Sequence, residues 1–141
     1  MNRNRVEELR KVRHLIETLK EADKRLSVPF IMNMGVISNL YDIFTLSLAQ
    51  QDPTADPKDT NNRKKFLYAV LYLLSPATLV GDVMRHKLRE SVSAVLGCTP
   101  TGVSRDYKTA IFFYATYKDF SESVDMIVND MLYCLNKEDE E

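Results

Sequence analysis

The stretch RESVSAVLGCTPTGVSRDYK, from Arg89 to Lys108, has the most informative spacing in the 141-residue chain. A small residue, Ser93, is at its fifth place, Gly97 is at its ninth and Val103 is at its fifteenth. Two helices that cross steeply over a short turn need a small residue at the crossing, a residue that accepts a left-handed backbone at the corner, and an apolar side chain between them. The spacing therefore predicts two helices joined at a tight corner.

The second of these helices has a start signal of its own and a polar outer face. Thr99 can cap the first N–H groups, and Pro100 suits the first helical position because its missing N–H would have no partner there. The outward residues that follow are small, hydroxyl-bearing or basic: Thr101, Gly102, Ser104, Arg105 and Lys108. Such a turn fits a DNA major groove, where arginine can bind guanine through two hydrogen bonds. We predict a base contact for Arg105 and backbone contacts for Ser104 and Lys108, and we place Thr101 on the same DNA-binding surface.

In these residues the stretch resembles the helix-turn-helix of phage repressors and related bacterial regulators. The resemblance covers residues 89–108 and rests on Ser93, Gly97, Val103 and the polar opening of the second helix, although the fifth place is commonly alanine in that family. It implies sequence-specific binding to double-stranded DNA, usually as a dimer on paired half-sites. Three basic residues ahead of or at the start of the first helix are candidates for phosphate contacts: Arg85, Lys87 and Arg89.

The aromatic segment TAIFFYATYKDF, from Thr109 to Phe120, follows the predicted reading turn directly. One interpretation is a recognition helix whose far half is anchored in the core. The other is a helix that is buried throughout and makes no contact with DNA bases. The sequence leaves both open.

Composition and charge limit the classes of function. The net charge of −1 argues against a protein that coats nucleic acid through bulk positive charge. Charge is nevertheless divided along the chain: residues 81–110 hold five basic and three acidic residues, whereas residues 111–141 hold two basic and eight acidic ones. The candidate reading segment is basic, and the C-terminal end, KEDEE, is acidic.

The fold prediction is a single compact all-α domain of about five to six helices that contains the helix-turn-helix. Only four glycines and five prolines are present, which favours few, long elements, and no useful strand-like alternation occurs. Within residues 1–141 we expect a helical scaffold and dimerisation region in 1–75, the helix-turn-helix region in 76–120, and a C-terminal helix with the acidic tail in 121–141.

An amphipathic helix is predicted from Val6 to Leu26, with apolar residues at steps of three or four. Some of them also recur every seven residues: Leu9 and Ile16, and Val12, Leu19 and Leu26. This helix either packs on its own protomer or forms a short coiled-coil seam in a homodimer.

A second helix is predicted to start with Pro29 in its first turn and to run to about Gln51, as a central element with apolar residues on nearly every side. The polar segment from Gln50 to Asn62, with two Asp-Pro pairs, is predicted to be a surface loop. A third helix should end before Pro76.

Other chemistry has no signal in the sequence. The four scattered glycines form no phosphate-binding fingerprint, and the two cysteines and two histidines lack metal-ligand spacing, so we expect neither enzyme activity nor a cofactor or metal. The thiols of Cys98 and Cys134 are expected to be reduced, in a cytoplasmic protein. The uncharged run from Val28 to Tyr41 is only 14 residues long, too short to span a bilayer, and is expected to form a buried helix.

The resulting hypothesis is a small DNA-binding protein of phage or mobile-element type, which regulates transcription or organises DNA. The alternative is a non-catalytic helical module that binds other proteins or forms part of an assembly, without nucleic acid. The exposure of Arg105 separates the two hypotheses, because an arginine buried in an ion pair with Asp106 or Glu122 would favour the alternative.

Overall fold

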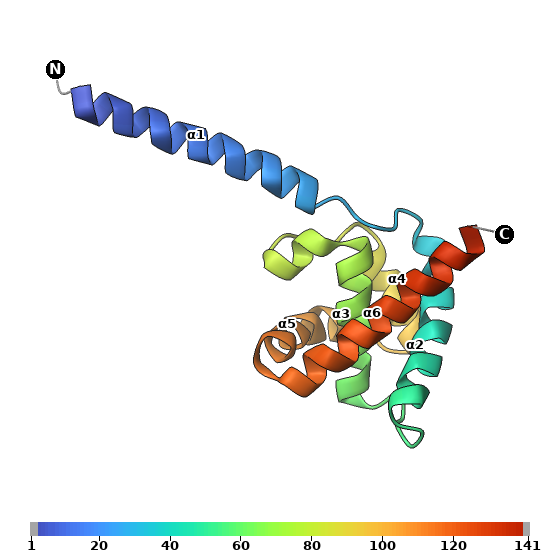
Figure 1. The fold of residues 1–141 in the computed structure, drawn as a ribbon. Helices are drawn as coiled ribbons and strands as arrows, with labels where there is room; N and C mark the ends of the chain where they lie inside the picture. Colours follow the sequence, from blue (N-terminus) through green and yellow to red (C-terminus); the bar gives the residue numbers. More distant parts are fainter. Residues whose placement is uncertain (1–2, 140–141) are drawn as a thin grey trace.

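The computed structural model describes residues 3–139, and all regular secondary structure within this range is helical. Six α-helices and two 3₁₀-helices follow one another (Figure 1): α1 Arg3–Leu26, η1 Met34–Val36, α2 Ile37–Gln51, α3 Thr60–Leu74, η2 Pro76–Val80, α4 Leu88–Leu96, α5 Pro100–Thr116 and α6 Lys118–Asp139. The predicted all-α class is confirmed. No helix in the described range is long and apolar enough to cross a membrane.

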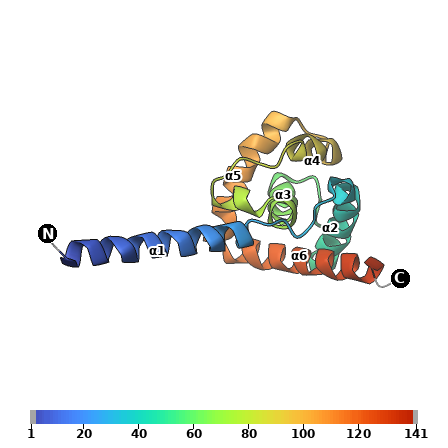
Figure 2. The ribbon, with the colours of Figure 1, turned by 90° about the horizontal axis from the view of Figure 1, so that it is seen from above.

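The centre of the protein is α3, whereas the sequence predicted that the second helix would be central. Figure 2 looks almost along α3, with α2, α4, α5 and α6 around it. Its buried apolar side chains are at most 1% exposed: Phe66, Leu67, Ala69, Val70, Leu71, Leu73 and Leu74. By contrast, α2 buries one side only, and Leu46 on its outer side is 67% exposed. We call residues 27–139, which include this core, the body.

The segment before α2 is not the helix that Pro29 predicted. Residues 27–33 are non-helical, and η1 precedes α2, which begins only at Ile37. The backbone N–H of Ile31 donates to the carbonyl of Leu73, 3.0 Å away, so this segment is tied to the end of α3. Phe30 stacks on Tyr72 with ring centroids 5.2 Å apart. These tertiary contacts override the local helix-start signal.

The N-terminal helix extends away from the body (Figures 1 and 2), which corrects the expectation that it packs on its own protomer. None of its residues is buried. Its apolar side chains, including Leu19 at 68% exposed, lie in solvent. The sequence pattern identified the helix correctly but could not show whether anything in the same chain covers it.

The aromatic segment after the corner is divided between two helices. Helix α5 ends at Thr116, and Tyr117 has an extended backbone before α6 begins. Within α5 only Val103 and Ala110 are buried, and Phe112 is 56% exposed, so α5 is not buried throughout. The acidic end of the chain, Glu140 and Glu141, lies outside the described residues.

Candidate nucleic-acid interface

The corner between α4 and α5 has the backbone geometry that the spacing predicted. Gly97 adopts a left-handed conformation with φ +69° and ψ +30° directly after α4. The backbone N–H groups of Gly97 and Cys98 both turn back to the carbonyl of Ser93, the latter at 3.1 Å. These bonds satisfy the end of α4 and reverse the chain within a few residues.

Helix α5 starts where its capping residues predicted. The Oγ1 atom of Thr99 accepts a hydrogen bond from the N–H of Gly102 at 3.0 Å, and Pro100 occupies the first turn. The cap leaves fewer N–H groups at this end without a partner. The start of α5 is thus defined locally, within the quoted stretch.

Small and apolar side chains hold the two helices together. Ser93 is 5% exposed, and its Oγ donates to the carbonyl of Glu90 at 2.8 Å, which satisfies the hydroxyl inside its own helix. Val92 of α4 and Val103 of α5 are at most 1% exposed and belong to the same hydrophobic core. Of the three residues of the spacing, Ser93 and Val103 are thus buried, and Gly97 has a left-handed backbone.

The predicted contact residues of α5 lie on its outer side. Thr101, Arg105 and Lys108 are exposed, and Ser104 is half-buried. The Arg105 side chain is 81% exposed, and its Nε lies 3.9 Å from Oδ1 of Asp106. An exposed ion pair at this distance holds the guanidinium only weakly. Arg105 is therefore not buried in an ion pair.

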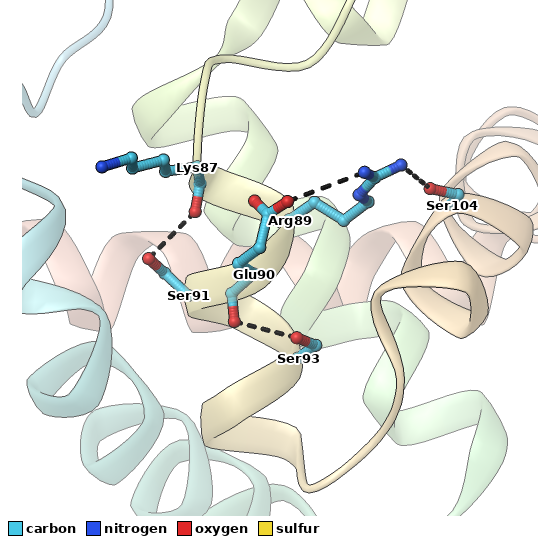
Figure 3. A network of polar contacts seen from close by, with 6 residues as sticks. All are labelled: Lys87, Arg89, Glu90, Ser91, Ser93 and Ser104. Carbon is cyan, nitrogen blue, oxygen red and sulfur yellow. Dashed lines mark hydrogen bonds and ion pairs between the residues drawn. The ribbon is translucent and has the colours of Figure 1, made fainter.

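A direct contact joins the outer sides of α4 and α5. The Nη1 atom of Arg89 donates to Oγ of Ser104 at 3.0 Å, and the Nη2 atom lies 3.6 Å from Oε1 of Glu90 (Figure 3). The sequence placed both residues on the interface but did not anticipate this bond, which joins residues 15 positions apart. The bond places Arg89, one of the predicted phosphate contacts, next to the opening turn of α5.

A shallow hollow of about 430 Å³ collects most of the predicted residues. Five of the seven line it: Arg85, Lys87, Arg89, Ser104 and Lys108. Its other ionisable lining side chains are Asp82, His86, Glu90 and Tyr107. Arginine and lysine side chains outnumber carboxylates there by four to two, so the hollow is predominantly basic. Thr101 and Arg105 do not line it.

Arg85 differs from its neighbours because its guanidinium already has protein partners. Its Nη1 donates to the carbonyl of Ile31 at 3.2 Å, and its Nη2 donates to the carbonyl of Met32. It thereby ties the segment after α1 to the start of the α4 region. Each terminal nitrogen therefore has a protein partner, and phosphate contact by Arg85 stays a prediction.

Lys87 has a left-handed backbone with φ +65°, the sole non-glycine residue of positive φ in residues 3–139. Its carbonyl accepts bonds from the N–H of Ser91 at 3.1 Å and from the Ser91 hydroxyl at 3.0 Å. Figure 3 shows the Lys87 and Arg89 side chains leaving α4 in different directions. The two cations thus cover different parts of the surface.

The far half of α5 is fixed by aromatic contacts that the sequence did not predict. Tyr114 stacks on Tyr68 of α3 at 4.2 Å between ring centroids, and its hydroxyl donates to Oδ1 of Asp125 on α6 at 2.8 Å. That hydrogen bond to a carboxylate, with lesser effects of burial and charge, raises the pKa of Tyr114 to about 12. One end of α5 is therefore anchored to two helices while its opening turn faces solvent.

Comparison with known proteins found no family model, no curated protein and no solved structure that matches the chain. Among the described residues, no group of three or more His, Cys, Asp or Glu side chains is placed to hold a metal ion.

Proposed function

We propose that the protein binds double-stranded DNA by placing the opening turn of α5 in a major groove. The observation that carries the proposal is the exposure of Arg105, 81% for the side chain, on a helix whose start is defined by Gly97 and Thr99. A rigid corner presents this arginine without the entropy cost of ordering a loop, and its guanidinium can bind guanine through two hydrogen bonds.

The other polar residues then divide into backbone contacts. Thr101 and Lys108 flank Arg105 on the same side of α5 at helical spacing. Ser104 and Arg89, already bonded to each other, line the basic hollow beside that turn. Phosphates fit such a surface because hydroxyl and cationic donors bind them without reading sequence.

As a whole, the proposed protein is a small regulator of transcription or a DNA-organising protein of phage or mobile-element type. It acts in the cytoplasm, where Cys98 and Cys134, both free in the structure, stay reduced. It binds as a homodimer through α1, so that two copies of α5 contact paired half-sites.

A second candidate function is protein binding without nucleic acid. Its support is an apolar surface on α2 and α6, where Leu46 and Tyr133 are each 67% exposed and Met126 is 55% exposed. Leu46 and Tyr133 border one shallow hollow together with Ile43 and Cys134. Such a patch fits a protein partner, although scattered exposed apolar residues are common on soluble surfaces.

Fluorescence anisotropy of a labelled duplex over a salt series separates these two functions. The test variant is Arg105→Ala/Lys108→Ala, and the matched control is Lys58→Ala/Lys118→Ala, which removes the same charge from exposed positions outside α4 and α5. The proposal expects micromolar or tighter binding that weakens steeply with salt, is lost in the test variant and persists in the control. Equal losses in both variants, or no binding by folded wild-type protein at low salt, would favour the second candidate.

A further inference from the structure

The N-terminal helix presents a long apolar stripe that nothing else within residues 3–139 covers. Helix α1 has 24 residues, a length of about 36 Å, and none of them is buried. The exposed fractions of its large apolar side chains run from 36% at Val6 to 69% at Leu26. An isolated helix gains little stability from propensity alone, so such a stripe calls for a partner helix.

The spacing of the stripe is that of a two-stranded coiled coil. Leu9 and Ile16 form one series at seven residues, and Val12, Leu19 and Leu26 form the other, three residues further on. These are the two core positions of a heptad repeat. Among parallel coiled coils, a β-branched residue at the first position, as at Ile16, with leucine at the second, as at Leu19, favours two strands.

We propose that α1 pairs with α1 of a second copy in a short parallel coiled coil. The charges beside the seam fit this arrangement. Glu8 directly precedes the core residue Leu9, and Arg13 directly follows the core residue Val12. In a parallel pair, Glu8 of one copy faces Arg13 of the other, five residues further on, and the two-fold axis repeats the attraction.

An antiparallel pair fits the same charges poorly. The flank that holds Arg13 also holds Lys20, seven residues further on. In an antiparallel pair this flank faces the same flank of the partner, so basic residues would lie opposite basic residues. The charges therefore select the parallel orientation as well as the second copy.

Asp23 limits the strength of the pair. It occupies the core position seven residues after Ile16, where each copy would bring a carboxylate to the seam. Polar residues at this position cost stability. The apolar seam thus runs from Leu9 to Leu19, with Leu26 beyond the interruption, and we expect a reversible dimer whose population depends on concentration.

The pairing of α1 does not depend on DNA binding. Its role in bringing two α4–α5 corners to one duplex does rest on the proposed function. In a parallel pair both bodies follow from the same end of the coiled coil, at Leu26. Two α4–α5 corners could then approach one duplex together.

Sedimentation equilibrium of the full chain over a micromolar concentration series tests the pairing. Wild type should show a monomer–dimer equilibrium. Ile16→Asn/Leu19→Ser should remain monomeric with an unchanged melting transition, because both residues are exposed on a helix that extends away from the body. The matched control, Glu17→Ser/Lys24→Ser, changes two exposed polar residues outside the seam and should still dimerise. Asp23→Leu should tighten the dimer by about tenfold or more. A monomeric wild type, or a seam variant that still dimerises, would overturn the proposal.

Charge-reversal variants test whether the two α1 helices pair in parallel or antiparallel orientation. In a parallel pair, Arg13→Glu and Glu8→Arg should each weaken self-association by about tenfold, and a mixture of the two variants should pair as a heterodimer, where both contacts are attractive again. In an antiparallel pair, Arg13→Glu would instead strengthen association, because Glu would face Lys20. That second result would refute the parallel arrangement. Duplex binding by each variant is measured separately, so a dimer without DNA binding would contradict only the proposed function.

Discussion

Gly97 forms the corner through its backbone conformation and not through lack of space. A Cβ added at this position would meet no atom within 4 Å, but φ is +69°. For an L-residue the left-handed region costs about 1–2 kcal/mol, because Cβ approaches the following carbonyl. The position therefore constrains the backbone while leaving room for a side chain.

Gly97→Ala should accordingly lower the free energy of unfolding by about 1 kcal/mol, measured by urea denaturation. Gly97→Asn should cost less, since asparagine accepts the left-handed region more readily. If the alanine variant is as stable as wild type while the asparagine variant is not, the corner does not have the backbone described.

Tyr114→Phe should lower the free energy of unfolding by about 1 kcal/mol at neutral pH, because it removes the bond to Asp125 and keeps the stack on Tyr68. The pKa of Tyr114 is raised from 10.0 to about 12 in the folded protein. The stabilising effect of the hydroxyl is thus complete below pH 10 and disappears as the pH rises through 12.

Urea denaturation of wild type and Tyr114→Phe over this alkaline range checks the sign. The difference in unfolding free energy between the two should be constant up to pH 10 and should shrink above it. A difference that grows with rising pH would contradict the hydrogen bond to Asp125.

Structural roles that depend on residues close in the sequence were predictable, whereas contacts with residues far away in the sequence were not. Ser93, Gly97 and Val103 act within ten residues of one another, so their spacing sufficed. The bonds of Arg85 to the carbonyls of Ile31 and Met32, which lie 54 and 53 residues away, were not predicted. No pattern in one sequence shows which carbonyls a folded chain brings to an arginine.

Helix α5 begins at a cap formed by a neighbouring residue, and its far half is held by residues distant in the sequence. Its start rests on the Thr99 cap, whereas its far half is held by Tyr68 of α3 and Asp125 of α6. This arrangement sets the direction of the opening turn relative to the core. It also explains why the aromatic segment after Lys108 does not bury the predicted reading face.

Thr99→Ala should lower the free energy of unfolding by about 1 kcal/mol, since the N–H of Gly102 loses its partner. Thr99→Ser keeps the hydroxyl and should stay within a few tenths of wild type. Thermal or urea denaturation distinguishes them. Equal losses for Ala and Ser would mean that packing of the threonine methyl group, and not the cap, is responsible.

Helix boundaries that depend on neighbouring residues were predicted, whereas one that depends on distant contacts was not. The end of α3 before Pro76 and the start of α5 at Pro100 were predicted, because proline and capping residues act on their neighbours. The start of α2 was missed, because hydrogen bonds from Ile31 to α3 and from Arg85 hold the preceding segment in a non-helical conformation. Pro29 tolerates either conformation.

For the whole molecule, the sequence predicted the all-α class but not the separation of α1 from the body. An amphipathic helix shows the same periodicity whether its partner is its own chain or another copy. In the structure the body folds around α3, and α1 extends from it with every large apolar side chain exposed. The proposed DNA-binding turn and the proposed pairing helix thus lie in different parts of the chain and can be changed separately.

Selection of bound duplexes from a random pool, carried out with wild type and with Arg105→Ala, tests the central claim most directly. If the opening turn of α5 reads DNA, wild type should enrich two related half-sites at a fixed spacing of about one helical turn or a multiple of it. Arg105→Ala should bind the same site with a loss of about 1–3 kcal/mol and relaxed choice at one base pair of each half-site. Folded wild-type protein that enriches no sequence, or an Arg105→Ala variant that enriches the same sequence with the same stringency, would contradict the claim.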